Sequence, residues 1–269
     1  MLFRSKLAFF DDVTKLPNRR SYKKDITRIT GEIAEGKKCA VILLDLDHFK
    51  EINDIYGHTM GDRLLAGVSR HLVDKSESIS RAVEAGIENR VYRIAGDEFI
   101  VLLNNLSTVQ DAVTIAEQIQ NSLSSPILVD DKSFVAKASM GVSVYPLHSV
   151  LPESLFQYAD MAMYEAKKQG RGRLCIFDED FLNRIVFESE LENDIRNALK
   201  EDEFHLVYQP KYSVANNTAN EFEALIRWSH PTKGNVSPGV FIPFAEERNL
   251  INDIGLWVVE KLCQTIKNM

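Results

Sequence analysis

Two adjacent acidic residues stand in a short break between two apolar runs. The segment Val91–Leu103 reads VYRIAGDEFIVLL, and its break is Ala95-Gly96-Asp97-Glu98. Gly-Asp is one of the pairs that close a two-residue β-hairpin, because glycine takes a positive φ without a Cβ clash. Such a hairpin holds Asp97 and Glu98 at the rim of a sheet. Hard divalent cations bind carboxylate oxygens, so the pair suggests a metal site; an ordinary acidic turn is the alternative.

A second pair of acids ends another apolar run. Cys39–Leu44 is β-type and is followed by Asp45-Leu46-Asp47, in which the two acids share one face of an extended chain. Asp45 and Asp97, with the Leu46 carbonyl, suit one or two Mg²⁺, an ion that completes its shell with water and substrate phosphates. This donor set is typical of two-metal nucleotidyl transfer. For Asp45 alone, a capping or strand-end role is the alternative.

Basic and amide side chains further along the chain suit a nucleotide. Lys167 and Arg171 flank a predicted helix end and could bind phosphates, although the helix dipole also favours basic residues there. Lys50 lies one turn past the acidic strand, where it either reaches a transferring phosphate or stays solvated. Asp62 can accept from guanine N1–H and the exocyclic amine, and Asn53 can meet O6 or N3. Asp62 also suits a helix N-terminus.

Strands and helices alternate around these residues. After the acidic strand we expect a short helix over 48–56 with Asp47 as its N-cap, a loop over 57–61, and a second helix that begins near Asp62. One connection is a hairpin, so the pattern predicts an α+β fold with helices covering a mixed or antiparallel sheet. The other predicted elements are helices over 19–34, 108–123, 152–169 and 181–199 and strands over 127–129, 134–145 and 174–177.

The amino-acid composition limits the classes of protein to which this chain can belong. The chain has 269 residues, of which 45% are hydrophobic and 26% charged, as in a soluble protein of one or two domains. A net charge of -7 argues against binding to nucleic acid or anionic membranes through the overall field. Cys39, Cys175 and Cys263 lack metal-ligand spacing and fit a reduced, cytoplasmic setting. No run approaches the ~20 apolar residues of a membrane span.

Four motifs together resemble the GGDEF domain of diguanylate cyclases. They cover about Phe10–Phe177 and read, in order, DDVTKLPNRR, LDLDHFKEINDIYGHTMGD, RIAGDEF and ADMAMYEAKKQGRGR. The resemblance implies a palm-like α+β sandwich related to nucleotide cyclases. It also implies that two GTP molecules condense into cyclic di-GMP and two pyrophosphates between two facing domains, so that a homodimer forms at least transiently.

The resemblance also implies a role for each matching residue. The ligands of Mg²⁺ or Mn²⁺ would be Asp45, the Leu46 carbonyl and Asp97. Asp97 or Glu98 would assist deprotonation of the 3′-hydroxyl, and Gly96 would let the backbone approach the nucleotide. The remaining matches are Asn53 and Asp62 for guanine, and Lys50, Lys167 and Arg171 for phosphates.

Three places depart from the family pattern. Ala95 replaces the first glycine of the signature, which is tolerable if φ there is negative. Lys15 replaces the glycine of T-G-L-P-N-R and puts the geometry of that turn in question. Gly86 and Asn89 stand where many cyclases have the Arg-x-x-Asp of their inhibitory product site, so feedback through that site is not expected.

The C-terminal part resembles the beginning of an EAL domain, the cyclic di-GMP phosphodiesterase barrel. VYQPKYS, FEALIRW and IGLW carry the likeness, with Glu223 matching a metal ligand and Gln209 and Arg227 matching substrate contacts. A (β/α)₈ barrel needs about 250 residues. We therefore expect an incomplete barrel fragment without hydrolytic activity. The expected division is a cyclase-like domain over 1–178, a linker helix over 179–202 and the fragment over 203–269.

Different classes of function remain open at this point. The complete set of charged groups favours an active cyclase. The tandem architecture and the Ala95 and Lys15 departures favour a silent GTP-binding module that regulates the phosphodiesterase part. A protein-interaction platform without nucleotide binding would leave the phosphate and guanine groups unexplained.

Overall fold

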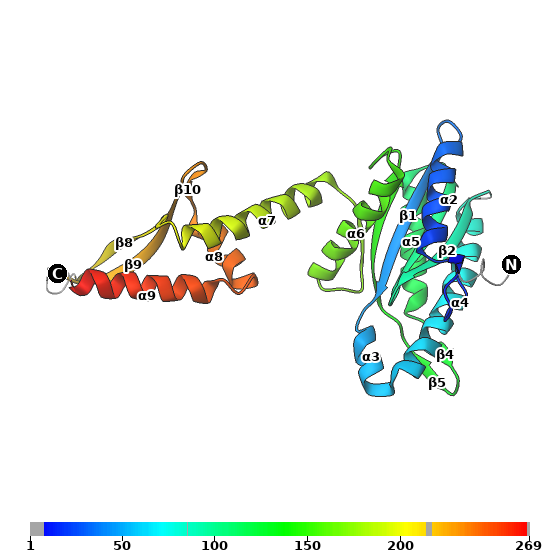
Figure 1. Cartoon of the computed structure of the whole chain (residues 1–269), viewed down its shortest axis with the longest axis horizontal. Coiled ribbons are helices and arrows are strands. Elements are labelled where there is room, and N and C mark those ends of the chain that lie inside the picture. The colour runs from blue at the N-terminus through cyan, green and yellow to red at the C-terminus, as the bar shows by residue number, and fades with distance from the viewer. Residues whose placement is uncertain (1–7, 85, 214–216, 268–269) are drawn as a thin grey trace. The chain divides into compact units, whose positions relative to one another are not determined.

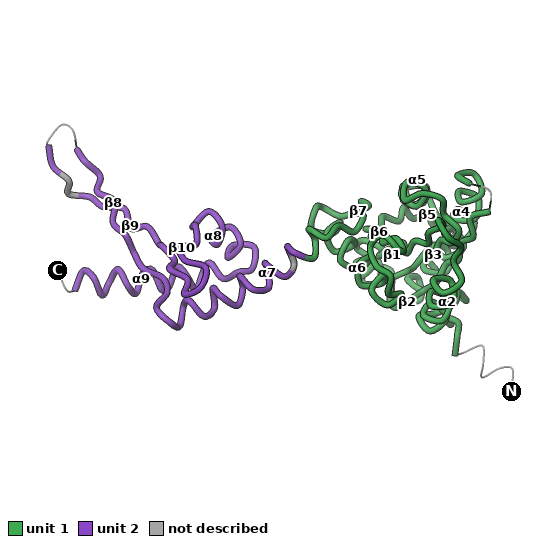
Figure 2. Tube along the Cα trace, turned by 90° about the horizontal axis from the view of Figure 1, so that it is seen from above, with its two compact units in different colours: residues 1–182 green, residues 183–269 purple. Residues whose placement is uncertain are grey.

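A computed structural model describes residues 8–84, 86–213 and 217–267. The chain divides into two compact units, residues 1–182 and 183–269, which Figure 2 shows in different colours. None of the described helices is long and apolar enough to cross a membrane.

Unit 1 is built on a five-stranded sheet of order β2-β3-β1-β6-β7. Four strands pair antiparallel, and only β7 joins in parallel, beside β6. β1 is the central strand of the sheet, and both of its faces are buried. This position explains why its sequence is a continuous apolar run. The strands are β1 (Lys38–Leu46), β2 (Glu88–Ala95), β3 (Glu98–Leu106), β6 (Ala138–Tyr145) and β7 (Leu174–Ile176).

Helices cover both faces of this sheet (Figure 1). Alternate residues of β1 point to opposite sides: Ala40 and Ile42 join a core with α4 and α5, whereas Val41 and Leu43 join a core with α2 and α6. The predicted α+β fold with a mainly antiparallel sheet is therefore confirmed. The helices are α2 (Arg19–Glu32), α4 (His58–Val83), α5 (Val109–Leu123) and α6 (Pro152–Lys168).

Two details after β1 differ from the sequence-based expectation. Helix α3 (Phe49–Tyr56) has His48 as its N-cap, with a φ of 62° and no side-chain cap, so the prediction of Asp47 as the cap is wrong. The predicted loop over 57–61 is also wrong, because only Gly57, with a φ of 80°, interrupts the chain before α4 begins.

The predicted strand over 134–145 is in fact two strands. Its first residue belongs to β5 (Lys132–Phe134), which pairs with β4 (Ile127–Val129) in a separate hairpin. β6 begins only at Ala138, where the chain enters the main sheet.

Unit 2 begins at Asn183, which lies in helix α7 (Glu179–Ala198). A three-stranded sheet of order β10-β9-β8 packs with helices around a core that includes Phe204, Trp228, Phe241 and Trp257. The helix predicted over 181–199 is present as α7. The elements are β8 (Phe204–Ser213), β9 (Thr218–His230), β10 (Gly234–Val236), α8 (Pro238–Glu247) and α9 (Ile251–Lys267).

Candidate nucleotide and metal site

The β2–β3 connection is the tight hairpin that the sequence predicts. Ala95 pairs with Glu98, so only Gly96 and Asp97 form the loop. Gly96 has a φ of 51°, the left-handed conformation that glycine adopts without strain. Ala95 is not among the residues with a positive φ, so a side chain in place of the usual glycine strains nothing there.

The hairpin tip lies against the end of β1. Glu98 is the cross-strand partner of Asp45, and the Leu46 amide donates a 3.4 Å hydrogen bond to the Asp97 carbonyl. Lys167, in the last turn of α6, places its Nζ 2.8 Å from Asp45 Oδ1. The sheet and one helix thus bring together five residues that the sequence analysis singled out.

Burial, and after it repulsion by neighbouring acids, raises the pKa of two acids of this site, Asp97 and Glu98. Burial raises the pKa of Asp97, and the charge of Asp45 adds to the effect. Burial also raises the pKa of Glu98, followed by the charges of Asp160, Asp45 and Asp97. Asp160 was missed by the sequence analysis. Its spacing of seven residues from Lys167, two turns of one helix, was the available signal.

The donor set at this position fits a hard divalent cation. Two carboxylates that repel one another need a positive partner, and the Lys167 ammonium already neutralises part of the charge of Asp45. In the described part of the chain, no three His, Cys, Asp or Glu side chains gather to hold a metal ion. The expected set contains only two such side chains, Asp45 and Asp97, with the Leu46 carbonyl as the third ligand.

The two guanine candidates lie on neighbouring helices. Asn53 is partly buried on α3, and Asp62 is exposed in α4. Gly61, which sequence reasoning did not select, is buried between these helices, where a Cβ would overlap the Asn53 carboxamide. Gly61 is therefore a packing glycine that leaves room for Asn53. Lys50 is exposed in the first turn of α3.

Arg171 lies in an unusual loop between α6 and β7. Gly170, Arg171 and Gly172 have φ values of 111°, 62° and 58° in succession. The loop borders a polar cavity of about 290 Å³ whose lining includes Asp47, Lys137 and Arg171. Lys137 and Arg171, against the single carboxylate of Asp47, give this lining an excess of positive charge, which favours an anionic ligand.

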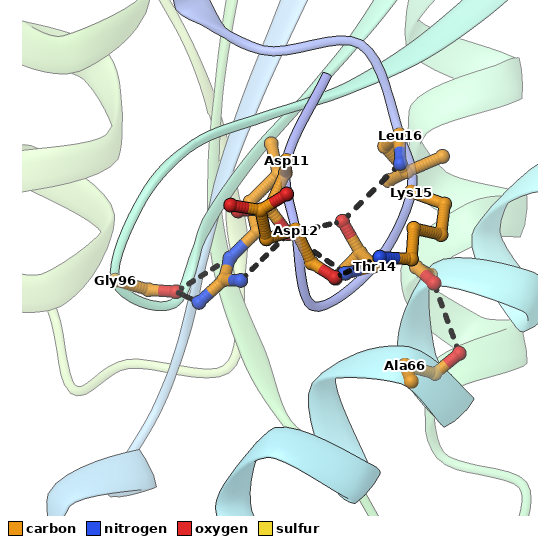
Figure 3. Close-up of polar contacts among 9 residues, drawn as sticks. Asp11, Asp12, Thr14, Lys15, Leu16, Ala66 and Gly96 are labelled. Atoms are coloured by element: carbon orange, nitrogen blue, oxygen red, sulfur yellow. Dashed lines mark hydrogen bonds and ion pairs between the residues drawn. The ribbon is translucent and has the colours of Figure 1, made fainter. Parts of the chain in front are cut away.

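A buried arginine, Arg93, stabilises the hairpin through hydrogen bonds to its backbone. Arg93 is 9% exposed and donates to the Gly96 carbonyl from Nε (3.0 Å) and Nη2 (2.7 Å). Its Nη1 lies 2.8 Å from Asp11 Oδ1, which also accepts from the Thr14 amide and hydroxyl (Figure 3). The DDVT segment therefore takes part in fixing the acidic hairpin, which sequence analysis did not foresee.

Lys15 keeps the turn that the family builds with glycine. The turn is closed by hydrogen bonds from Lys15 N to Asp11 O (3.0 Å) and from Asp11 N to Leu16 O (2.8 Å). Lys15 has a φ of 61°, a conformation that costs a non-glycine residue about 1–2 kcal/mol. A hydrogen-bonded turn therefore forms with lysine at this position, with strain at Lys15.

The residues that match the EAL family lie on one face of the unit 2 sheet. Gln209 of β8 is the direct partner of Glu223 on β9. Arg227 follows Glu223 by four residues on the same strand, so both side chains leave the same face. The register thus brings these three side chains to one surface.

Comparison with known families identifies two regions of the chain. Residues 8–173 match the family described as diguanylate cyclase, GGDEF domain, and residues 192–269 match the EAL domain. The chain therefore belongs to the GGDEF family, and its C-terminal part is an EAL-domain segment.

Several curated relatives have both regions in common with this chain. The bifunctional diguanylate cyclase/cyclic di-GMP phosphodiesterase MucR of Pseudomonas aeruginosa is 36% identical over 97% of this chain and 37% of its own length. The cyclic di-GMP phosphodiesterase PdeR of Escherichia coli is 35% identical over 94% of this chain and 36% of its own length. The chain thus spans about a third of the length of these relatives.

Solved GGDEF domains are similar to unit 1. A structure of YfiN (TpbB) from P. aeruginosa comprising only the GGDEF domain has 34% identity and a TM-score of 0.58, over 65% of this chain and 98% of that one. The GGDEF domain of DgcB from Caulobacter crescentus, solved in complex with c-di-GMP, has 27% identity and a TM-score of 0.52, over 63% and 95% of the two chains.

Proposed function

We propose that the GGDEF domain of this chain is a diguanylate cyclase that condenses two GTP molecules into cyclic di-GMP. The observation that supports this most is the convergence of Asp45, the Asp97–Glu98 hairpin and Lys167 at one end of the sheet. We take 1–178 as the catalytic domain, 179–202 as a linker helix and 203–269 as the EAL-like fragment.

Each group then has a chemical task. Asp97 or Glu98 takes the proton of the attacking 3′-hydroxyl, and the hairpin holds both carboxylates in place. Asp45, the Leu46 carbonyl and Asp97 would hold Mg²⁺ or Mn²⁺, which neutralises charge that develops at the α-phosphate.

The substrate-binding side chains come from the surrounding helices and the α6–β7 loop. Lys50, Lys167 and Arg171 bind phosphate oxygens, whereas Asn53 and Asp62 select guanine. Gly96, at the exposed hairpin tip, lets the backbone approach the nucleotide. Because each domain binds one GTP, two copies of the chain must face each other for the reaction.

A direct test follows cyclic di-GMP and pyrophosphate formation from GTP and Mg²⁺ at several protein concentrations. We expect turnover to rise faster than linearly with protein, and Asp97→Ala to lower it by at least about a hundredfold, as for loss of a group that stabilises the transition state. Asp131→Ala, which removes an exposed acid between β4 and β5, is the matched control and should stay active.

A second candidate is a silent GTP-binding module that regulates an EAL phosphodiesterase. Relatives named phosphodiesterases favour it, because PdeR and the P. aeruginosa protein NbdA both match over more than nine tenths of this chain. GTP binding without any product at high protein concentration would favour this candidate over the cyclase. Hydrolysis of cyclic di-GMP is not expected from this chain, where Gln209, Glu223 and Arg227 form only part of a site.

A further inference from the structure

Asp47 has a structural environment different from that of Asp45. Its Oδ1 accepts a 2.7 Å hydrogen bond from the hydroxyl of Ser139, a fully buried residue of β6. Its Oδ2 accepts a 2.9 Å hydrogen bond from the Gly172 amide. The Asp47 amide donates to the Lys137 carbonyl at 2.8 Å, so the backbone is fixed as well. Both carboxylate oxygens therefore have donors from the protein itself.

The loop that Asp47 contacts is restrained at its ends, and the Gly170 amide there donates to the Lys167 carbonyl at 3.3 Å. Main-chain hydrogen bonds hold its two ends, from Arg171 N to Ala166 O (3.1 Å) and from Met140 N to Arg173 O (2.9 Å). Between them, Gly172 has a φ of 58° and Arg171 a φ of 62°, which is strained for a residue with a side chain. A charge-assisted bond to the Gly172 amide stabilises this conformation at its centre.

We propose that Asp47 is a positioning residue that holds the α6–β7 loop in the shape in which Arg171 can bind phosphate. The inference rests on the proposed function, because the phosphate comes from the nucleotide. It assigns Asp47 neither to the metal nor to the cap of α3. A carboxylate suits the role because it accepts two hydrogen bonds from different directions and donates none.

The proposal predicts different behaviour for two substitutions. Asp47→Ala removes both acceptors and should free the loop. Asp47→Asn can still accept from the Gly172 amide and can donate to the Ser139 hydroxyl, which is able to accept. The amide variant should therefore rescue the loop, whereas a metal ligand would be impaired by both changes.

The first measurement is amide hydrogen exchange at Gly172 by NMR, which needs no nucleotide. We expect Asp47→Ala to accelerate exchange by about tenfold or more, as for a lost hydrogen bond to a charged group, and Asp47→Asn to stay close to the unsubstituted protein. Asp54→Ala, an exposed acid on α3, is the matched control. Unchanged exchange in Asp47→Ala would overturn the proposal whether or not the chain binds GTP.

The second measurement is a double-mutant cycle on the affinity for GTP with Mg²⁺, repeated with inorganic tripolyphosphate. Where Arg171 is present, Asp47→Ala should weaken GTP binding by about tenfold. In the Arg171→Ala variant, the same change should weaken it by less than about twofold. Equal losses in both backgrounds would show that Asp47 does not act through Arg171. If the unsubstituted protein binds neither ligand, the proposed function fails, and with it the phosphate role, while Gly172 exchange still decides whether Asp47 holds the loop.

Discussion

Arg93 joins two segments of unit 1 that are distant in sequence. It pairs with Asp11, 82 residues away, and its guanidinium also holds the carbonyl of Gly96 at the hairpin tip. Partial burial alone would raise the pKa of Asp11. The hydrogen bonds from Thr14 and Arg93 and the charge of Arg93 outweigh that effect and hold the pKa of Asp11 below its ordinary value.

This pair makes the stability of unit 1 depend on pH. A carboxyl with a lowered pKa in the folded state stabilises the protein above its unfolded pKa, near 4, and this contribution disappears as pH falls through the folded pKa. We expect Asp11→Asn to lower the free energy of unfolding at pH 7 and to flatten its decline as pH falls below about 4. Urea unfolding across this range measures both effects. Parallel curves for the two proteins would contradict the prediction.

Asp11→Asn is expected to lower the free energy of unfolding, whereas relief of the strain at Lys15 should raise it. Lys15→Gly should raise the free energy of unfolding by roughly 0.5–1 kcal/mol, because relief of the positive φ exceeds the extra entropy of an unfolded glycine. The exposed hydrogen bond from Lys15 to the Asp12 carbonyl subtracts little when it is lost. Lys24→Gly, the same change on an exposed position of α2, should instead destabilise by about 1 kcal/mol. Urea midpoints of both variants give the comparison.

At the scale of elements, close packing of α6 on β6 fixes the height of Lys167 above the sheet. Gly141 makes this contact possible, because a Cβ there would overlap the Ala159 carbonyl and the Met163 amide. These atoms belong to a helix backbone and cannot move independently. The distance between Lys167 and Asp45 is therefore set in part by a glycine on the neighbouring strand.

Gly141→Ala should separate helix and strand. We expect a loss of about 1–3 kcal/mol in the free energy of unfolding, which is typical of an overpacked core, and a fall in cyclase turnover beyond what the loss of folded protein explains. Gly31→Ala in α2, where a Cβ meets no atom within 4 Å, is the control and should stabilise slightly. Urea unfolding and GTP turnover on the same samples separate stability from activity, and unchanged turnover would contradict the role of helix height.

The packing between helices also governs the guanine candidates. Gly61→Ala should push the Asn53 carboxamide aside and weaken GTP binding by about tenfold, as for one lost polar contact, with a smaller effect on inorganic tripolyphosphate. Gly31→Ala again serves as the control. Equal losses for both ligands would mean that Gly61 supports the fold and not the base.

Local sequence was sufficient to predict the structure where a few adjacent residues determine the backbone conformation. The Gly96–Asp97 hairpin followed from turn chemistry, and β1 from an apolar run that is buried on both faces. Residues 57–61 were misassigned because two glycines resemble a loop, although Gly61 is helical and serves packing. Asp47 was misassigned as a cap because its partners, Ser139 and Gly172, are distant in sequence. Tertiary partners of this kind leave no local signal.

At the scale of the whole molecule, the two units differ in their tryptophan content, so tryptophan fluorescence reports on only one of them. Both tryptophans, Trp228 and Trp257, are buried in the core of unit 2, and unit 1 has none. Unit 2 is the smaller unit and leaves large apolar side chains of its sheet exposed, among them Tyr212 at 59% and Phe222 at 60%. A smaller buried fraction gives less hydrophobic stabilisation.

We therefore expect unit 2 to unfold first. In a urea titration, tryptophan fluorescence should change at a lower midpoint than the main change in far-ultraviolet circular dichroism, which both units contribute to. Trp257→Phe keeps Trp228 as a single reporter and should leave this order unchanged. Coincident midpoints for the two signals would show that the units unfold together.

The ion pair between Lys167 and Asp45 has a consequence for how ligands arrive. Under the proposed assignment the ammonium serves as countercharge to Asp45 until a divalent cation takes that place, and the released lysine is then available for a phosphate. The two exchanges are linked, so each ligand must tighten binding of the other by the same factor. Cation and nucleotide are then heterotropic partners, and a titration with either one alone underestimates the affinity of the pair.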